Sequence, residues 1–460
     1  MILKVGGMHT AGYDLLRRDR QRLWHPAAQM RTYAEDPPLI VERAEGGWLH
    51  TADGRRVYDG ISSWWCKALG HRHPRLLARM QAQLERFEHH ILAGATNEAA
   101  VGLIERWLVH ANRPHAGWFS CGFYADNGST GVEVALKMAV QWQAQQGRPG
   151  RSGLATLEGA YHGETIGALS LTDQPRYAAA FAPLLFPVHR LRGLPLRAGE
   201  HDPAWQDAAA EWPALAAQLD PLAGRLAAVV VEPVMQGAAG IRFHSPDLIR
   251  RLRGWCDAHG VLLIADEIAA GCWRLGQPLA CQHAGVLPDL AVLAKGFTAG
   301  AVPGSLVLAR ACISEGFDGT WDSGRAFLHS NTFAGNALAV AAGHALLDAV
   351  ELDALAEGLP ERARALRAHL DAIAARHAGV RGVRACGMAG AITLCRRDGS
   401  DEDPAQRRAW RTHRAALELG ALLRPMGDSM YLMPPLNAGL DELAGLAGVL
   451  DRALAAVPCA

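Results

Sequence analysis

Three short apolar segments in the middle of the chain, each followed at once by an ionisable side chain, constrain the fold most strongly. The segments are residues 227–231 (AAVVV) before Glu232, residues 261–265 (VLLIA) before Asp266 and Glu267, and residues 290–294 (LAVLA) before Lys295. About five residues is too short for a core helix, and unbroken apolar runs are typical of strands buried on both faces. Residues 248–259 have the spacing of an amphipathic helix. The pattern predicts an α/β fold with a mostly parallel sheet covered by helices.

The polar side chains after these segments predict a ligand site. In open parallel sheets, ligands bind just beyond the carboxyl ends of the strands, so we expect Glu232, Asp266 and Lys295 to share one crevice. Taken by itself, Lys295 is better explained as a lysine at a strand end whose side chain reaches solvent. Taken by itself, Asp266 is explained equally well as a helix cap or as part of a surface ion pair. Together they offer an amine that can form a Schiff base with a carbonyl cofactor and an acid that can keep a pyridine nitrogen protonated.

Two further segments fit a flat, phosphate-bearing cofactor. Gly128 and Ser129, in Asp-Asn-Gly-Ser-Thr, precede a helical pattern, where free amides and the helix dipole attract phosphate. Ordinary helix capping explains the same residues equally well. Tyr161 offers an aromatic face on which a ring can stack. Gln236, in EPVMQG, can hydrogen-bond a phenolic oxygen of the cofactor, although loop glutamines commonly face water.

Composition excludes several other classes of protein. Lys plus Arg equals Asp plus Glu at 46 each, so no overall charge favours nucleic acid or an anionic membrane. The 9 cysteines are scattered, odd in number and include no C-x-x-C pair, a pattern that suits reduced thiols in a cytoplasm better than a disulfide framework or a zinc site. The first 21 residues lack an export signal, and residues 329–347 are too polar to span a bilayer.

The flanks differ from the centre and predict the domain organisation. We expect a large domain over residues 76–346 and a smaller α+β domain formed from residues 1–75 and 347–460. Pro/Arg/Ala-rich residues 190–225 and the charged residues 396–408 are interpreted as surface excursions.

A series of motifs in order along the chain resembles one enzyme family. DGISSWW, ADNGSTGVEVALKM, YHGETIGALS, VVVEPVMQG, LLIADEIAAG, LAKG and HSNTFAGN look like class III (fold type I) PLP-dependent aminotransferases, from about Trp24 to Leu436. The resemblance implies pyridoxal 5′-phosphate (PLP) as cofactor, with Lys295 as the Schiff-base lysine and Asp266 as the pyridinium partner. It also implies phosphate binding by Gly128 and Ser129 and stacking by Tyr161.

The resemblance also implies a homodimer with shared active sites and a small-molecule substrate. Thr332, with Asn331 beside it, would reach the phosphate of the neighbouring subunit, and Ser330 would lie near substrate. Trp64 would line the substrate pocket. Arg424, in RPMG, would bind a substrate carboxylate, a task that suits a planar bidentate donor.

The segments SSWW, RPMG and YLMPPL resemble the branch that aminates 8-amino-7-oxononanoate to 7,8-diaminononanoate in biotin synthesis, with S-adenosylmethionine as donor. Tyr431 stands where ornithine- and aminobutyrate-type relatives carry an arginine for the α-carboxylate of glutamate, which disfavours the glutamate/2-oxoglutarate couple. Ala27 replaces a usual tyrosine, Trp273 and Leu275 are bulky in a glycine-rich stretch, and Glu164 replaces an aspartate. These departures leave lysine or another amine open as donor.

Other functions remain to be separated by experiment. Another class III aminotransferase, acting on ω-amino acids or diamines with pyruvate, shares the same motifs. A PLP racemase, mutase or decarboxylase would share the cofactor, and a PLP-binding regulator would need a DNA-binding segment. A Rossmann dehydrogenase is disfavoured, because no G-x-G-x-x-G opens a strand–helix turn.

Overall fold

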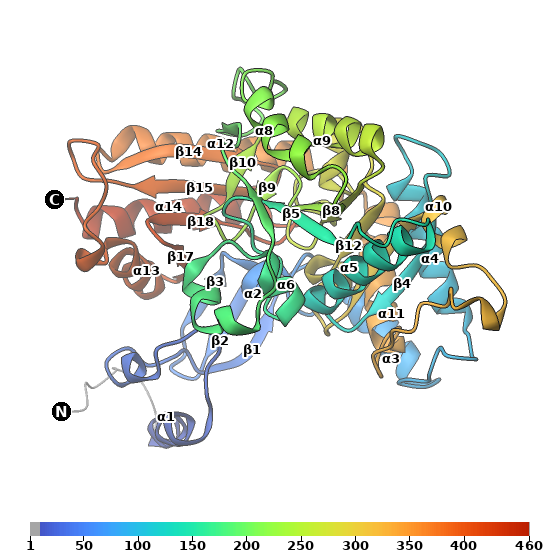
Figure 1. Cartoon of the computed structure of the whole chain (residues 1–460). Helices are drawn as coiled ribbons and strands as arrows, with labels where there is room; N and C mark the ends of the chain where they lie inside the picture. Colours follow the sequence, from blue (N-terminus) through green and yellow to red (C-terminus); the bar gives the residue numbers. More distant parts are fainter. Residues whose placement is uncertain (1–9, 460) are drawn as a thin grey trace.

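A seven-stranded mixed sheet forms the centre of the computed structural model, which describes residues 10–459 (Figure 1). Its order is β4-β13-β12-β11-β8-β5-β6. Six strands run in one direction, and β13 alone runs in the opposite direction. The strands are β4 (Phe119–Ala125), β5 (Gly153–Leu157), β6 (His189–Leu191), β8 (Leu226–Val231), β11 (Leu262–Asp266), β12 (Leu290–Leu293) and β13 (Ser305–Arg310). The α/β class and the mostly parallel sheet are confirmed.

Helices cover both faces of this sheet because its strands are apolar on both sides. Val229 and Val231 of β8 pack in one core cluster with helices α8 (Trp212–Leu219) and α9 (Pro246–His259). Ala228 and Val230, which point the opposite way, pack with α5 (Gly128–Gln145). All four side chains are fully buried. Nearer β4, the first face is covered by α3 (Pro74–Leu84), α4 (Glu98–Ala111) and α11 (Ala337–Leu352).

Two four-stranded sheets are built from the N- and C-terminal segments. One sheet has the order β1-β2-β3-β16 and the other has the order β14-β15-β18-β17. The second sheet is drawn in orange to red at the left of Figure 1. Their strands are β1 (Val41–Glu45), β2 (Trp48–Thr51), β3 (Arg56–Asp59), β14 (Val380–Cys386), β15 (Ala389–Leu394), β16 (Ala421–Leu422), β17 (Pro425–Met426) and β18 (Ser429–Leu432). Helices α12 (Leu359–Arg376), α13 (Arg408–Glu418) and α14 (Leu440–Ala456) supply the core beside them. The domain boundaries themselves stay a prediction.

The remaining elements are short, except for α1. A small sheet joins β7, β10 and β9. The elements are α1 (Thr10–Arg22), η1 (Met30–Ala34), α2 (Ser62–Trp65), α6 (Ile166–Leu171), α7 (Pro175–Ala178), η2 (Ala179–Leu184), β7 (Leu196–Arg197), η3 (Asp220–Leu222), β9 (Met235–Gln236), β10 (Arg242–His244), η4 (Ala280–Ala284), η5 (Lys295–Thr298), α10 (Ala311–Gly316), η6 (Trp321–Ser323) and η7 (Pro404–Gln406).

The interpretation of residues 190–225 as a surface excursion is wrong for β6 and α8, although many residues between these two elements are exposed. Leu191 belongs to β6 at the edge of the central sheet, and Leu215 and Leu219 of α8 are fully buried against that sheet. Alanine is the commonest residue of this stretch, and its leucines, which outnumber its prolines and its arginines, determine how it packs.

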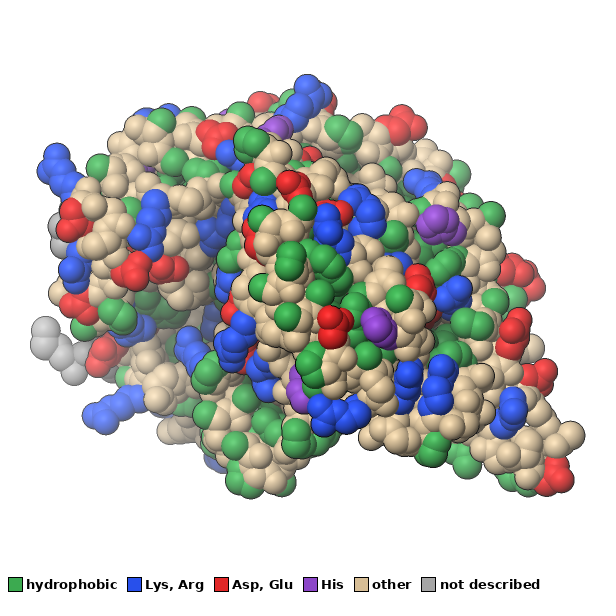
Figure 2. All heavy atoms as spheres, turned by 45° about the horizontal axis from the view of Figure 1, so that its top comes forward, with side chains coloured by type: hydrophobic (Ala, Val, Ile, Leu, Met, Phe, Trp, Pro, Cys, Tyr) green, Lys and Arg blue, Asp and Glu red, His purple; other side chains and the backbone are tan. Residues whose placement is uncertain are grey.

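The surface charge and the helices bear on the expectations from composition. Basic and acidic side chains are intermixed on the face drawn in Figure 2, consistent with the balanced charge. Among the described residues, no helix is long and apolar enough to cross a bilayer. The expectation that the start lacks an export signal rests partly on residues 1–9, which lie outside the described residues.

Candidate active site

A cavity of about 480 Å³ opens at the carboxyl edge of the central sheet. Five parallel strands deliver residues to it from their carboxyl ends. The contributions are Gly128 and Ser129 after β4, Tyr161 after β5, Glu232 after β8, Asp266 at the end of β11 and Lys295 after β12. The expectation that Glu232, Asp266 and Lys295 share a crevice is therefore confirmed.

Lys295 presents an amine to this cavity from a tight turn. Its backbone φ of 47° lies in the left-handed region, which non-glycine residues seldom adopt. Nζ lies 4.6 Å from the centre of the Trp65 ring. Burial lowers the pKa of Lys295, while the negative charges of Asp266 and Glu232 oppose that shift. A lowered pKa favours the neutral amine, the form that attacks a carbonyl.

Asp266 is fixed by a neighbouring histidine. The carboxylate is 4% exposed and accepts a hydrogen bond from His162 Nδ1 at 2.8 Å and one from the amide of Ile268 at 3.1 Å. His162 Nε2 in turn lies 3.0 Å from Thr156 Oγ1. Because both ring nitrogens are engaged, the imidazole holds the carboxylate in one orientation. Sequence reasoning missed His162, although it stands next to Tyr161 in the motif that was singled out.

Glu232 is a second carboxyl group in the cavity wall. Its oxygens accept hydrogen bonds from the amides of Tyr161 at 2.9 Å and Gly237 at 3.0 Å. Burial raises the pKa of Glu232 to about 7, partly offset by His162. Glu232 thus anchors the loop that carries Tyr161.

Glu267, next to Asp266, does not line the cavity. It is fully buried and accepts hydrogen bonds from the amides of Ala280 at 2.7 Å and Cys281 at 3.0 Å. Burial raises the pKa of Glu267 from 4.5 to about 7. Its role is to cap the turn η4 rather than to contact a ligand.

This raised pKa predicts a pH-dependent stability. Because the folded pKa exceeds the unfolded one, the contribution of Glu267 is fully present below pH 4.5 and is lost as the pH rises to about 7. Over that window the free energy of unfolding should fall by on the order of 3 kcal/mol more in the parent than in Glu267→Gln. Urea unfolding at a series of pH values measures both slopes. Parallel slopes would contradict the prediction, whatever the absolute stability of the variant.

The start of α5 offers a seat for phosphate. Asn127 caps this helix with its side chain accepting from the amide of Thr130, and its carbonyl accepts from the amide of Gly131. The preceding amides, those of Gly128 and Ser129, have no acceptor within the helix and face a ligand site. A Cβ on Gly163 would approach Ser129 Oγ to 2.2 Å, so glycine is required for this close contact.

Of the two other residues expected to contact the cofactor, Tyr161 and Gln236, only Tyr161 lines the cavity. Tyr161 lines the cavity, with its hydroxyl donating to Glu164 at 2.8 Å. Gln236 is fully buried but does not line it, and its Nε2 donates to the Glu158 carbonyl at 2.8 Å. Trp65 lines the cavity and was missed, although it stands in the SSWW motif beside Trp64.

The expected substrate residues lie outside this cavity. Arg424 stacks over Trp64 with 4.9 Å from its guanidinium carbon to the ring centre, and its Nη2 lies 3.5 Å from the Ala27 carbonyl. Trp64 is 38% exposed, so the pair faces solvent. Tyr431 is fully buried and makes an edge contact with Trp65 at 6.1 Å. Through Trp65 it reaches the cavity wall.

The segment from Ser330 to Thr332 is not part of the cavity in this single chain. Ser330 and Thr332 are exposed, and Asn331 is half-buried with its Oδ1 unpaired among the described residues. Their assignment to substrate and to the cofactor of a neighbouring subunit stays a prediction.

The departures from the family pattern lie in different places. Trp273 is buried against Trp107, and Leu275 is fully buried, so neither lines the cavity. Glu164 accepts from the Tyr161 hydroxyl, and Ala27 lies beside Arg424. Of these four residues, only Glu164 and Ala27 contact side chains that are expected to bind cofactor or substrate.

The chemistry of the lining residues fits PLP. Lys295 supplies an amine, Asp266 a nearly fully buried carboxylate, and the start of α5 free amides. Tyr161 and Trp65 supply aromatic surface for a planar ring. PLP uses each of these features: the amine, the acid, the phosphate seat and the aromatic walls.

Comparison with known proteins agrees with this geometry. The model of the family described as aminotransferase class-III matches residues 30–454. A relative from Geobacter sulfurreducens, named adenosylmethionine-8-amino-7-oxononanoate aminotransferase, is 35% identical, covering 95% of this chain and 96% of its own. A relative of the same name from Nitratidesulfovibrio vulgaris is 37% identical, covering 95% of this chain and 81% of its own.

Solved structures give the same result. The aminotransferase of that name from Methanocaldococcus jannaschii superposes with a TM-score of 0.88 at 27% identity, covering 97% of this chain and 99% of its own. A PLP-bound amine transaminase from an uncultivated Pseudomonas species superposes with a TM-score of 0.86 at 30% identity, covering 95% and 99%. The fold is therefore that of the fold type I transaminases.

Proposed function

Because this chain belongs to the class-III aminotransferase family and is a PLP-dependent transaminase, we propose that it aminates 8-amino-7-oxononanoate to 7,8-diaminononanoate. The proposed donor is S-adenosylmethionine and the proposed location the cytoplasm. The observation that carries the proposal is the convergence of Lys295, Asp266 and the α5 phosphate seat on one cavity. Relatives that carry the name of this activity match at 35–37% identity over nearly the whole chain.

The residues of the cavity divide the chemistry among them. PLP supplies a carbonyl that takes up the amino group and a ring that withdraws electrons from the reacting carbon. Lys295 would hold the cofactor, and its neutral Nζ is the group in the cavity that would take and return the proton of the reacting carbon. Asp266, oriented by His162, would keep the ring nitrogen of the cofactor protonated. Trp65 and Tyr161 shield these steps from water.

Arg424 is proposed to bind the carboxylate of the keto substrate. Its guanidinium is already oriented by the Trp64 ring and the Ala27 carbonyl, so little side-chain freedom is lost on binding. Tyr431 stands in the buried strand β18, in the segment where the resemblance gives ornithine- and aminobutyrate-type relatives an arginine. A single cationic group suits a substrate with one carboxylate better than glutamate with two.

Removing Arg424 should weaken binding of the keto substrate. A charge-assisted hydrogen bond contributes about 1.5–3 kcal/mol, so Arg424→Ala should raise KM for 8-amino-7-oxononanoate roughly 10- to 100-fold. The rate of the first half-reaction, with the donor alone, should change much less. Arg411→Ala, which removes an exposed arginine on α13, is the matched control. An unchanged KM for the keto substrate would remove Arg424 from this role.

A half-reaction screen tests the proposed function as a whole. The purified holoenzyme is mixed with S-adenosylmethionine, lysine, alanine or a diamine, and conversion of the cofactor to its amine form is followed by absorbance. Conversion by S-adenosylmethionine followed by re-oxidation with 8-amino-7-oxononanoate supports the proposal. Conversion only by the diamine, with return by pyruvate, supports an ω-amine transaminase, which the small side chain of Ala27 beside Arg424 would accommodate.

We also propose a homodimer with shared sites. The exposed Ser330–Thr332 segment is then supplied to the phosphate of the partner. Sedimentation of the holoenzyme measures the mass directly, and a monomer with full activity would contradict the proposal.

A further inference from the structure

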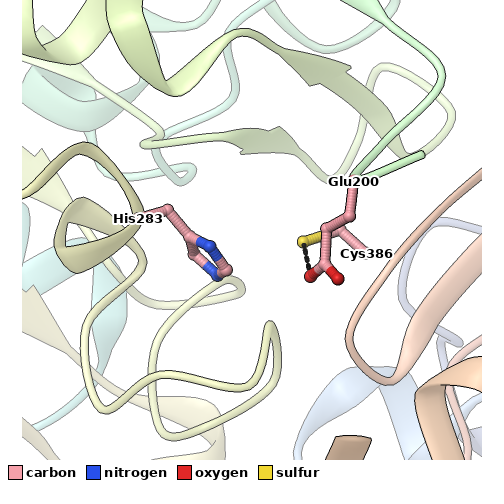
Figure 3. A group of neighbouring side chains, drawn as sticks. All are labelled: Glu200, His283 and Cys386. Carbon is pink, nitrogen blue, oxygen red and sulfur yellow. Dashed lines mark hydrogen bonds between the residues drawn. The ribbon is translucent and has the colours of Figure 1, made fainter. Parts of the chain in front are cut away.

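Glu200, His283 and Cys386 lie together (Figure 3). None of the three lines the cofactor cavity. Their ligand atoms all lie within 4.8 Å of one another, and within residues 10–459 no other three His, Cys, Asp or Glu side chains are grouped in this way. Cys386 Sγ donates to Glu200 Oε1 at 3.0 Å. Figure 3 shows the imidazole facing the thiol and the carboxylate.

Three separate segments deliver these side chains. Glu200 follows β7, His283 lies in η4, and Cys386 ends β14 in the C-terminal part of the chain. Gly199 pairs with Ala385, and a Cβ on Gly199 would lie 1.8 Å from the Ala385 carbonyl oxygen. Glycine at this position therefore allows the backbone approach that brings Glu200 to Cys386.

The histidine is prepared for coordination by its other contacts. His283 Nε2 lies 2.8 Å from the Leu275 carbonyl, so this nitrogen carries the proton and Nδ1 keeps the lone pair. A backbone carbonyl on the second ring nitrogen is the usual support of a metal-bound imidazole. Trp205 contacts the same ring edge-on, with 6.5 Å between centres, and limits its rotation.

The donor set selects the kind of ion. One thiol, one imidazole and one carboxylate suit Zn²⁺ or a related transition metal, whereas Mg²⁺ and Ca²⁺ prefer oxygen ligands alone. Tetrahedral bonds of about 2.0–2.3 Å place ligand atoms roughly 3.3–3.7 Å apart. The widest separation must therefore close by about 1 Å. Side-chain rotation of the exposed Glu200 supplies movement of this size.

The geometry points to a binding site for one zinc-like divalent ion at Glu200, His283 and Cys386, with the fourth position open to water. On binding, a metal–sulfur bond replaces the thiol S–H bond, and the proton passes to solvent. The ion would tie the C-terminal sheet to β7 and η4. Its effect is therefore on the stability of the folded chain, since all three ligands lie outside the cofactor cavity.

Metal titration of the tag-free holoenzyme tests the site. Calorimetry with Zn²⁺ should give one ion per chain, and Co²⁺ should give the visible absorption of a tetrahedral thiolate complex at longer wavelength than the cofactor bands. Thermal unfolding should shift upward with Zn²⁺, because the ion binds only the folded state. Mg²⁺ at the same concentration should neither bind in the calorimeter nor raise the temperature of unfolding.

Variants decide whether the ion sits on these residues. Cys386→Ser should weaken Zn²⁺ binding more than about 100-fold, and Glu200→Gln, at an exposed position, at least about 10-fold. Cys312→Ser, another cysteine far from the group in sequence, is the matched control and should bind as the parent does. Absence of binding, or equal binding by the Glu200→Gln and parent proteins, would overturn the assignment. Should Cys386→Ser fail to fold, the Glu200→Gln result and the cobalt spectrum still decide.

Discussion

Replacing Lys295 with alanine is expected to lower turnover by at least about 10⁴-fold, the largest effect of any single substitution in this chain. The variant loses both the amine that holds the cofactor covalently and the base that moves the proton. The phosphate seat of α5, Asp266 and the aromatic walls remain, so PLP should still bind without a covalent bond. Steady-state turnover and cofactor absorbance measure the two consequences separately.

A second substitution at the same position distinguishes the positive charge of the side chain from its ability to form a Schiff base. Lys295→Arg keeps a positive charge near Asp266 and Glu232 but has no amine that can form the Schiff base. It should be as inactive as Lys295→Ala. After borohydride reduction of the parent holoenzyme, peptide mapping should find the cofactor on Lys295 and not on Lys67 or Lys137. Full turnover by either variant, or a label on another lysine, would refute the assignment.

Replacing Asp266 with asparagine should give the second largest effect, a loss of about 10²–10³-fold in turnover. Asparagine keeps the size of the side chain and an oxygen for His162 Nδ1, which lies 2.8 Å away in the parent. It removes the negative charge that holds a proton on the pyridine nitrogen. The ring then withdraws electrons less well, and the carbanion at the reacting carbon becomes harder to form.

The measurement is a comparison of half-reaction rates in the parent, Asp266→Asn and Asp371→Asn. Asp371 is an exposed carboxylate of α12 paired with Arg367, so its substitution controls for loss of one negative charge. His162→Ala should fall between parent and Asp266→Asn, because it removes the support of the carboxylate and leaves the charge. A parent-like rate in Asp266→Asn would show that the ring nitrogen needs no acidic partner here.

The sequence predicted the sheet and its ligand edge because both follow from local chemistry. Strands β8, β11 and β12 are unbroken apolar runs. A polar residue at the carboxyl end of such a run lies at the edge of the sheet, where it lines the ligand cavity. Asn127, Gly128 and Ser129 were found for a similar reason, since a helix start has its own residue pattern.

Residues whose position depends on distant contacts were not found in this way. His162 acts through Asp266, which is 104 positions away in the chain. Trp65 and Trp64 are neighbours, yet one lines the cavity and the other faces solvent under Arg424, because four consecutive residues from Ser62 to Trp65 adopt positive φ. No periodic pattern in the sequence predicts such a left-handed turn. Leu215 was assigned to the surface because its neighbours are polar or small.

The parallel pairing of β3 with β16 has a consequence for how the protein forms. Ala421 lies opposite Tyr58, so more than three hundred residues must leave the ribosome before this edge of the first small sheet can close. Until then the β1–β2–β3 meander has an open hydrogen-bonding edge that invites pairing with other chains. Completion of the small sheet is therefore a late event of folding, and chaperone dependence should concentrate on this interval of synthesis.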